Sequence, residues 1–144
     1  MIYLDTSYLV RLYFEEPGFL VVRELVATDQ IACAVHGQAE ILSALHRKFR
    51  EGTITPRAYQ ARIDQFGAER DAGAFHWLPA GSEVLERVHT AYAGLTRTVY
   101  LRAADALHLA SAAANGFKAV YSNDRHLLAA APHFKLKGLN PLAG

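Results

Sequence analysis

The chain has 144 residues, a length typical of one domain around one buried core, so we expect one domain over residues 1–144. Hydrophobic residues make up 51% of the chain and charged residues 20%, which excludes general disorder. The net charge of +1 lacks the basic excess that would by itself indicate a nucleic-acid-binding protein.

Cysteine content and hydropathy exclude several further classes. The single cysteine, Cys33, lies in an apolar run and is expected to be buried, and one cysteine cannot form a disulfide framework or a cysteine-based zinc site. The N-terminus shows no signal-peptide pattern, and no run of 18 apolar residues is present to span a bilayer. We therefore expect a cytoplasmic protein.

Short apolar runs alternate with helical patterns along the chain. In chain order, the sequence predicts a strand over 2–4, helices over 7–14 and 19–27, a strand over 31–35, helices over 39–50 and 55–72, a strand over 75–78, helices over 82–96 and 103–115, a strand over 119–122, a helix over 125–131 and an edge strand over 135–139. Gly52 and Gly116 mark helix ends, whereas Thr55-Pro56 and Ser82 mark helix starts.

Strands separated by helices predict right-handed crossovers and a mainly parallel sheet. The expected fold class is α/β, a single three-layer domain with four to five strands flanked by helices.

Four carboxylates lie where an apolar segment ends or a helix begins. They are Asp5, Glu40, Asp105 and Asp124. Moving a charge out of water costs several kcal/mol unless a partner compensates it. One or two divalent metal ions are the simplest partner for four acids brought together.

The predicted sheet places these acids near one another. Asp5 follows the first strand and Asp124 follows the fourth, and ligands of open α/β sheets bind at the carboxyl ends of the strands. Glu40 and Asp105 lie near the starts of helices that begin on the same edge, where the positive helix end stabilises an anion.

Each acid also has a purely structural interpretation. Asp5 and Asp124 suit helix N-caps, and Glu40 suits a first-turn acid. Asp105 is harder to explain without function, because its neighbours are apolar on several sides.

Neighbouring polar side chains are candidates for supporting roles. Thr6 and Ser122 could orient the acids or form turns, and Arg125 could contact a phosphate or remain solvated. His108 follows Asp105 by three residues, and local hydrogen bonding is favoured over metal binding for it.

The four acidic segments together resemble the four motifs of the PIN-domain family, in order along essentially the whole chain: YLDTS around Asp5, AEILSAL around Glu40, DALHLA from Asp105 and SNDR around Asp124. Length and the absence of an extra domain make the chain most similar to the VapC toxins of toxin–antitoxin pairs. One departure is His36-Gly37 ahead of Glu40, where family members often carry a serine.

This resemblance implies a metal-dependent endoribonuclease that cleaves single-stranded RNA. Asp5, Glu40, Asp105 and Asp124 would be its catalytic and metal-binding residues, with Mg²⁺ or Mn²⁺ as cofactor. It also implies a cognate small antitoxin protein and a homodimer.

Two other functions stay open. A catalytically silent member of the fold could bind RNA or protein. An aspartate-based phosphohydrolase also begins with a strand ending in aspartate, but it needs a second aspartate where this chain has Ser7.

Overall fold

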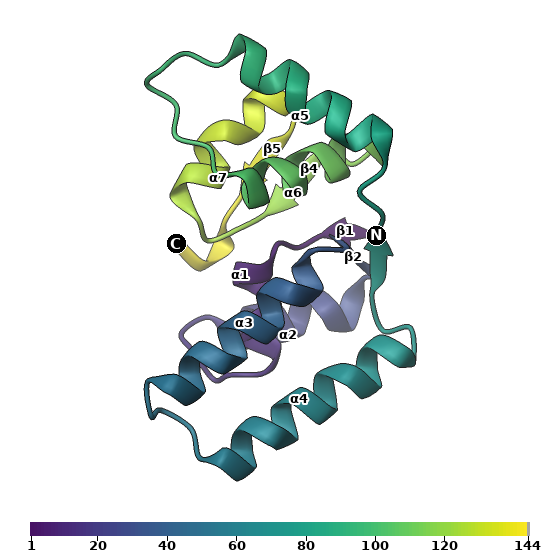
Figure 1. Ribbon diagram of the computed structural model, residues 1–144. Helices are drawn as coiled ribbons and strands as arrows, with labels where there is room; N and C mark the ends of the chain where they lie inside the picture. Colours follow the sequence, from purple (N-terminus) through teal and green to yellow (C-terminus); the bar gives the residue numbers. More distant parts are fainter. Residues whose placement is uncertain (144) are drawn as a thin grey trace.

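A computed structural model describes residues 1–143 as a mixed α/β fold (Figure 1). Gly144, the last residue of the expected domain, lies outside the described residues. The strands are β1 (Ile2–Tyr3), β2 (Ile31–Ala34), β3 (His76–Leu78), β4 (Ala119–Tyr121) and β5 (Lys137–Leu139). The α-helices are α1 (Thr6–Leu9), α2 (Phe19–Thr28), α3 (Gly37–Arg50), α4 (Pro56–Asp71), α5 (Ser82–Gly94), α6 (Ala103–Ala114) and α7 (Arg125–Ala130). Short 3₁₀ helices follow at η1 (Val10–Leu12), η2 (Ala131–Phe134) and η3 (Pro141–Ala143).

The parallel α/β class is confirmed, but the strands do not form one continuous sheet. β1, β2 and β3 pair in parallel in that order, and β4 pairs with β5, also in parallel. A single parallel bridge between Leu4 and Tyr121 joins the two sheets. Each sheet is thus smaller than the four- to five-stranded one expected. The reason is that β1 has only two residues. It pairs with β2 on one side and has little backbone left to form a continuous set of hydrogen bonds with β4 on the other.

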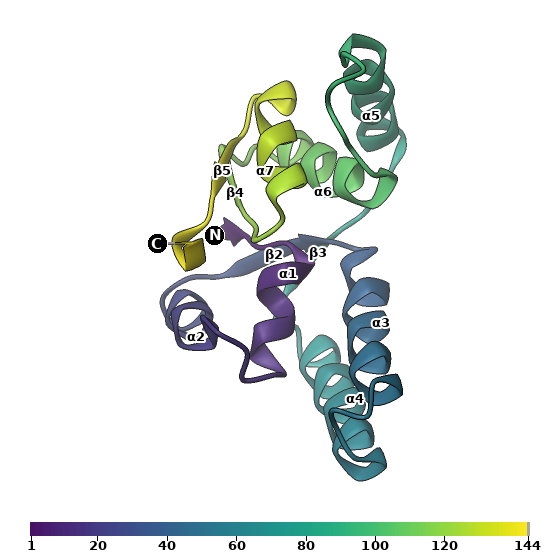
Figure 2. The same ribbon diagram turned by 90° about the vertical axis from the view of Figure 1, so that its left-hand side faces the viewer.

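Alternate residues of the strands face two separate cores. Tyr3 and Ala32 belong to a core with α5, α6 and α7, whereas Leu4 and Cys33 belong to a core with α1, α3 and α4. Side chains alternate across a strand, so β1 and β2 form the wall between the cores. Figures 1 and 2 show the same three layers, with α5, α6 and α7 on one side of the strands and α1 to α4 on the other.

Most predicted helix boundaries agree with the structure. Gly52 and Gly116 have φ angles of 74° and 80°, the left-handed conformation that ends a helix. Thr55 accepts a hydrogen bond from the Ala58 N–H at 3.1 Å, so it caps α4 as predicted. Ser82 was expected to cap the next helix, and this prediction is wrong. The carbonyl of Gly81 already accepts from the Leu85 N–H, which places Ser82 inside α5.

The first predicted helix, over 7–14, begins at Thr6 and divides into α1 and η1. Cys33 is fully buried, as predicted. Over residues 1–143, none of the helices combines the length and apolar character needed to cross a bilayer.

Candidate functional site

Asp5 is a buried carboxylate at the junction of β1 and α1. Its Oδ1 accepts hydrogen bonds from Ser7 Oγ at 2.5 Å and from the Tyr8 N–H at 3.3 Å, and its Oδ2 accepts from Ser122 Oγ at 2.5 Å. Burial raises the pKa of Asp5, while the charge of His108 and these hydrogen bonds oppose that rise. The N-cap interpretation of Asp5 is therefore confirmed, and the same carboxylate also contacts a distant loop through Ser122.

Asp124 is the N-cap of α7, which confirms its structural interpretation too. Its Oδ1 accepts from the backbone N–H groups of His126 and Leu127. Its own N–H donates to Ser122 Oγ at 2.9 Å. Ser122 thus connects Asp124 to Asp5, because its hydroxyl accepts from one residue and donates to the other.

Asp105 lies in the first turn of α6 with 6% of its surface exposed. Arg102 Nε donates to its Oδ2 at 3.0 Å, and Arg102 Nη2 donates to Asp124 Oδ2 at 2.5 Å. Burial raises the pKa of Asp105, and the Arg102 guanidinium opposes that rise. The fold therefore holds a positive charge between these two carboxylates.

Glu40 lies in the first turn of α3. Three side chains contact its carboxylate, all through the oxygen Oε1. Thr6 Oγ1 donates to Oε1 at 2.9 Å, His108 Nε2 lies 2.5 Å from it and His36 Nε2 lies 3.5 Å from it. Burial by itself would raise the pKa of Glu40, but the contacts with His108, Thr6 and His36 together outweigh burial and lower it.

His108 is a buried residue of α6 that contacts the Glu40 carboxylate. Its Nδ1 lies 2.6 Å from the Tyr3 hydroxyl, which accepts a hydrogen bond from the Ala34 N–H at 3.0 Å. Burial opposes a charge on His108, but its contacts with Cys33 and Glu40 outweigh burial and raise its pKa to about 10. The raised pKa favours a protonated ring, which can donate to Glu40. The hydrogen-bond partners Tyr3 and Glu40 are both distant in sequence, so the prediction of local hydrogen bonding is wrong.

Three of the four predicted acids are joined through shared partners, whereas Glu40 pairs with His108. Ser122 and Arg102 link Asp5, Asp124 and Asp105 into one network. Within residues 1–143, three potential metal-ligand atoms come within 4.8 Å of one another at a different grouping, His36, Glu40 and His108.

The supporting residues Thr6 and Ser122 contact Glu40 and Asp5 respectively, whereas Arg125 is exposed at the start of α7. No role at the site was predicted from the sequence for Ser7, Arg102 or His36. Arg102 and His36 are the N-cap residues of α6 and α3. Each lies three or four positions before its acid, a spacing that was visible in the sequence.

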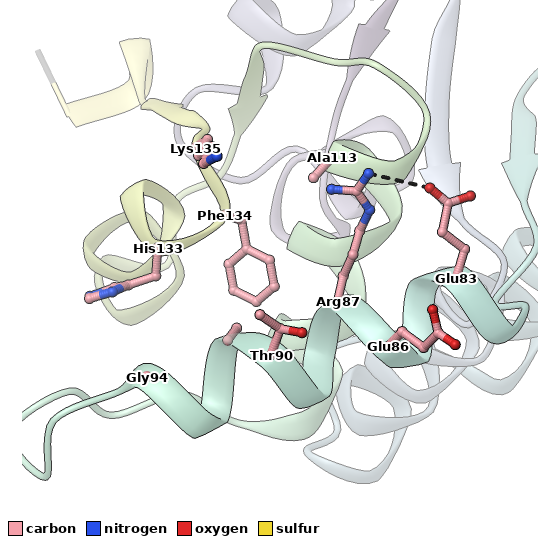
Figure 3. Close-up of a pocket in the computed structure, with 10 residues that line it drawn as sticks. Glu83, Glu86, Arg87, Thr90, Gly94, Ala113, His133, Phe134 and Lys135 are labelled. Carbon is pink, nitrogen blue, oxygen red and sulfur yellow. Dashed lines mark hydrogen bonds and ion pairs between the residues drawn. The ribbon is translucent and has the colours of Figure 1, made fainter.

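A cavity of about 510 Å³ lies between α5 and the segment after α7, in the layer of α5, α6 and α7 (Figure 3). Arg87, Phe134 and Lys135 are among its lining residues, and Arg87 Nη2 pairs with Glu83 at 3.3 Å. None of the four predicted acids lines this cavity.

Comparison with known structures supports the fold. The toxin VapC20 of Mycobacterium tuberculosis, described as cleaving the sarcin–ricin loop, aligns with a TM-score of 0.70 and 19% sequence identity, covering 90% of this chain and 95% of that one. VapBC2 of Rickettsia felis, bound to a DNA fragment of its promoter, aligns with a TM-score of 0.69 and 17% identity, covering 97% of this chain and 98% of that one. At these identities the likeness shows a shared fold.

Sequence comparison gives the family. No protein with a curated description is similar enough in sequence to count as a match. The family model of the PIN domain matches residues 2–132, nearly the whole chain. The four acidic motifs, the parallel α/β fold and this match lead to one conclusion: the chain belongs to the PIN-domain family.

Proposed function

We propose that this protein is a divalent-metal-dependent endoribonuclease, the toxin of a toxin–antitoxin pair, acting on single-stranded RNA. The observation that supports this proposal is a network in a PIN-domain chain that joins Asp5 and Asp124, which follow parallel strands, to Asp105 at the start of α6. Ligands of open α/β sheets bind at that edge.

The donor set suits Mg²⁺ or Mn²⁺. Carboxylate oxygens are the hard ligands that these cations prefer. The Arg102 guanidinium lies between Asp105 and Asp124, and this existing positive charge supports a cation site at the two carboxylates. Asp5, Asp105 and Asp124 would hold the cation, and Glu40 would complete the set through Oε2, the oxygen that makes none of its contacts described above.

A bound divalent cation supplies an activated water and neutralises the charge that develops on the phosphate. The protein's own residues fix the ligands. Ser7 and Ser122 hold both oxygens of Asp5, and Thr6 holds Glu40. Arg125, exposed beside the Asp124 cap, is placed to contact a phosphate of the substrate.

The partners follow from the same family. One structural neighbour is VapBC2, a toxin–antitoxin complex, and we extend that arrangement to this chain as a cognate small antitoxin. We also propose that this chain forms a homodimer.

The experiment is digestion of single-stranded RNA by the purified protein with Mg²⁺, with Mn²⁺ and with EDTA. Cleavage products are expected with either cation and none with EDTA. Undiminished cleavage in EDTA would contradict metal dependence. An absence of cleavage under every condition, together with measurable RNA or protein binding, would favour the catalytically silent module.

A further inference from the structure

Two histidines converge on Glu40 from opposite helices. His36 is the N-cap residue of α3 and lies one turn before Glu40, and His108 reaches the same carboxylate from α6. The rings of the two histidines pack against each other with centroids 4.3 Å apart. We propose that His36, Glu40 and His108 form a binding site for a transition-metal dication such as Co²⁺ or Zn²⁺. The site shares Glu40 with the proposed nuclease set but includes none of Asp5, Asp105 and Asp124, and this inference goes beyond the proposed nuclease function.

The spacing of the ligand atoms is close to what one cation requires. Ligands bound to Zn²⁺ at about 2.0–2.2 Å in a tetrahedron lie about 3.4 Å from one another. His36 Nε2 is already 3.5 Å from Glu40 Oε1, and the three ligand atoms all lie within 4.8 Å of one another. His108 Nε2 and Glu40 Oε1, at 2.5 Å, must separate by roughly 1 Å to reach that spacing. Glu40 is 32% exposed and has room to make this movement.

His108 is oriented in the way that metal-binding histidines usually are. Such a histidine offers one ring nitrogen to the cation and holds a partner with the other, which fixes the ring. In His108, Nδ1 contacts the Tyr3 hydroxyl at 2.6 Å, and Tyr3 is itself held by the Ala34 N–H. A cation at Nε2 takes the place of the proton that now lies between His108 and Glu40, and that proton leaves to solvent.

His36 retains unused hydrogen-bonding capacity. Its Nε2 lies 2.9 Å from the carbonyl oxygen of Ala104. Its Nδ1 is buried and has no hydrogen-bond partner within residues 1–143. Binding a cation at Nε2 gives up the contact with Ala104 and moves the ring proton to Nδ1, a cost that the bond to the cation must offset.

The ligand types separate this site from the carboxylate network. Imidazole nitrogens favour zinc, cobalt and similar metals, whereas Mg²⁺ favours oxygen ligands and retains several waters. Two imidazoles and one carboxylate therefore select a transition metal over Mg²⁺.

Co²⁺ titration of the metal-free, full-length protein without RNA tests the proposal. Visible absorption reports cobalt bound by nitrogen ligands in a low-coordinate site, because cobalt held by oxygen ligands and water absorbs far more weakly. The expected result is one strongly absorbing Co²⁺ per chain, displaced by Zn²⁺ and not by millimolar Mg²⁺. His36→Gln should weaken Co²⁺ binding by at least about tenfold, the equivalent of about 1.4 kcal/mol.

Two further variants locate the cation. His89→Gln removes an exposed histidine on α5 and should leave the Co²⁺ affinity unchanged. Asp124→Asn removes an acid of the nuclease network and should leave the absorption band in place. Thermal melting of each metal-free variant confirms that it is folded. No strong band in the wild-type protein, or a band that survives His36→Gln, would overturn the proposal. So would a band lost in Asp124→Asn.

RNA digestion separates this proposal from the nuclease proposal. Metal-dependent cleavage without a Co²⁺ band overturns only the histidine site. A histidine-dependent band without any cleavage leaves the histidine site standing and contradicts only the nuclease.

Discussion

Arg102 neutralises part of the negative charge of the predicted acids. Its guanidinium donates to Asp105 and to Asp124, two carboxylates that are otherwise separated by 19 positions of sequence, and its own pKa is raised through Asp105. A cation bound by these carboxylates must compete with it.

Replacing Arg102 by glutamine should strengthen Mg²⁺ binding, because the side chain that competes for Asp105 and Asp124 is lost. We expect an increase of about tenfold in affinity, or about 1.4 kcal/mol, measured by isothermal titration. Arg97→Gln removes the same charge from an exposed position in the same loop and serves as the control. Weaker Mg²⁺ binding in the Arg102 variant alone would show that Arg102 assists the cation.

The ion pair of His108 with Glu40 makes stability depend on pH. The pKa of His108 is raised from 6.5 to about 10 in the folded protein, so its contribution is complete below pH 6.5 and is lost as pH rises toward 10. In EDTA, the free energy of unfolding should therefore fall between pH 7 and pH 9.5, by at most about 1.4 kcal/mol per pH unit from this group.

Urea unfolding at both pH values measures that change. Cys33 and Glu40 both raise the pKa of His108, and Glu40→Gln removes the carboxylate, so this variant should show a weaker dependence on pH. Equal losses of stability in the wild-type protein and in this variant would show that other groups cause the change.

The sequence identified the acids but not most of their partners. Asp5 and Asp124 were predictable because each follows a strand and opens a helix, and both prove to be N-caps. His108 and Glu40 are 68 positions apart, and only the packing of α6 against the sheet brings them together. A local sequence pattern cannot predict a contact between residues so far apart.

At the scale of elements, the start of α3 is packed tightly against β2. A Cβ on Gly37 would lie 2.6 Å from Cys33 Sγ. This close approach fixes the first turn of α3, which carries Glu40. It also explains why glycine occupies a position inside a helix, where it is otherwise unfavourable.

Gly37→Ala should lower the free energy of unfolding by about 1–3 kcal/mol, the usual cost of overpacking. Chemical denaturation measures the effect. Cys33→Ala in the same chain removes the clashing sulfur and should recover part of the loss. Gly67→Ala in α4, whose new methyl meets nothing nearer than 3.9 Å, is the matched control. If both alanine variants behave alike, the close contact with Cys33 does not constrain α3.

Elements were predicted well where local chemistry decides them. Thr55-Pro56 and Gly116 set helix boundaries through capping and a left-handed turn, which depend on neighbouring residues only. The division of the strands into two sheets was not predictable, because it depends on the single bridge between Leu4 and Tyr121.

At the scale of the whole molecule, the two cores share the strands that separate them. Tyr3 faces one core and Leu4 the other, so neither core can lose β1 without exposing the second. That residues 1–144 form one domain stays a prediction, and this shared wall is the physical reason for it.

Unfolding in urea should accordingly be a single cooperative transition. Fluorescence of Trp77, which packs in the core with α1, α3 and α4, should change at the same urea concentration as far-ultraviolet circular dichroism. Midpoints that differ between the two signals would show that the cores unfold independently.

The central claim is that the acids of this PIN-domain chain cleave RNA. The most direct measurement is the rate of single-stranded RNA cleavage with Mn²⁺ by the wild-type protein, by Asp105→Asn and by Asp71→Asn, an exposed acid at the end of α4. We predict that Asp105→Asn loses at least about 100-fold in rate, or about 2.7 kcal/mol of transition-state stabilisation, while Asp71→Asn matches the wild type. A rate for Asp105→Asn within about threefold of the wild type, less than about 0.7 kcal/mol, would contradict the claim.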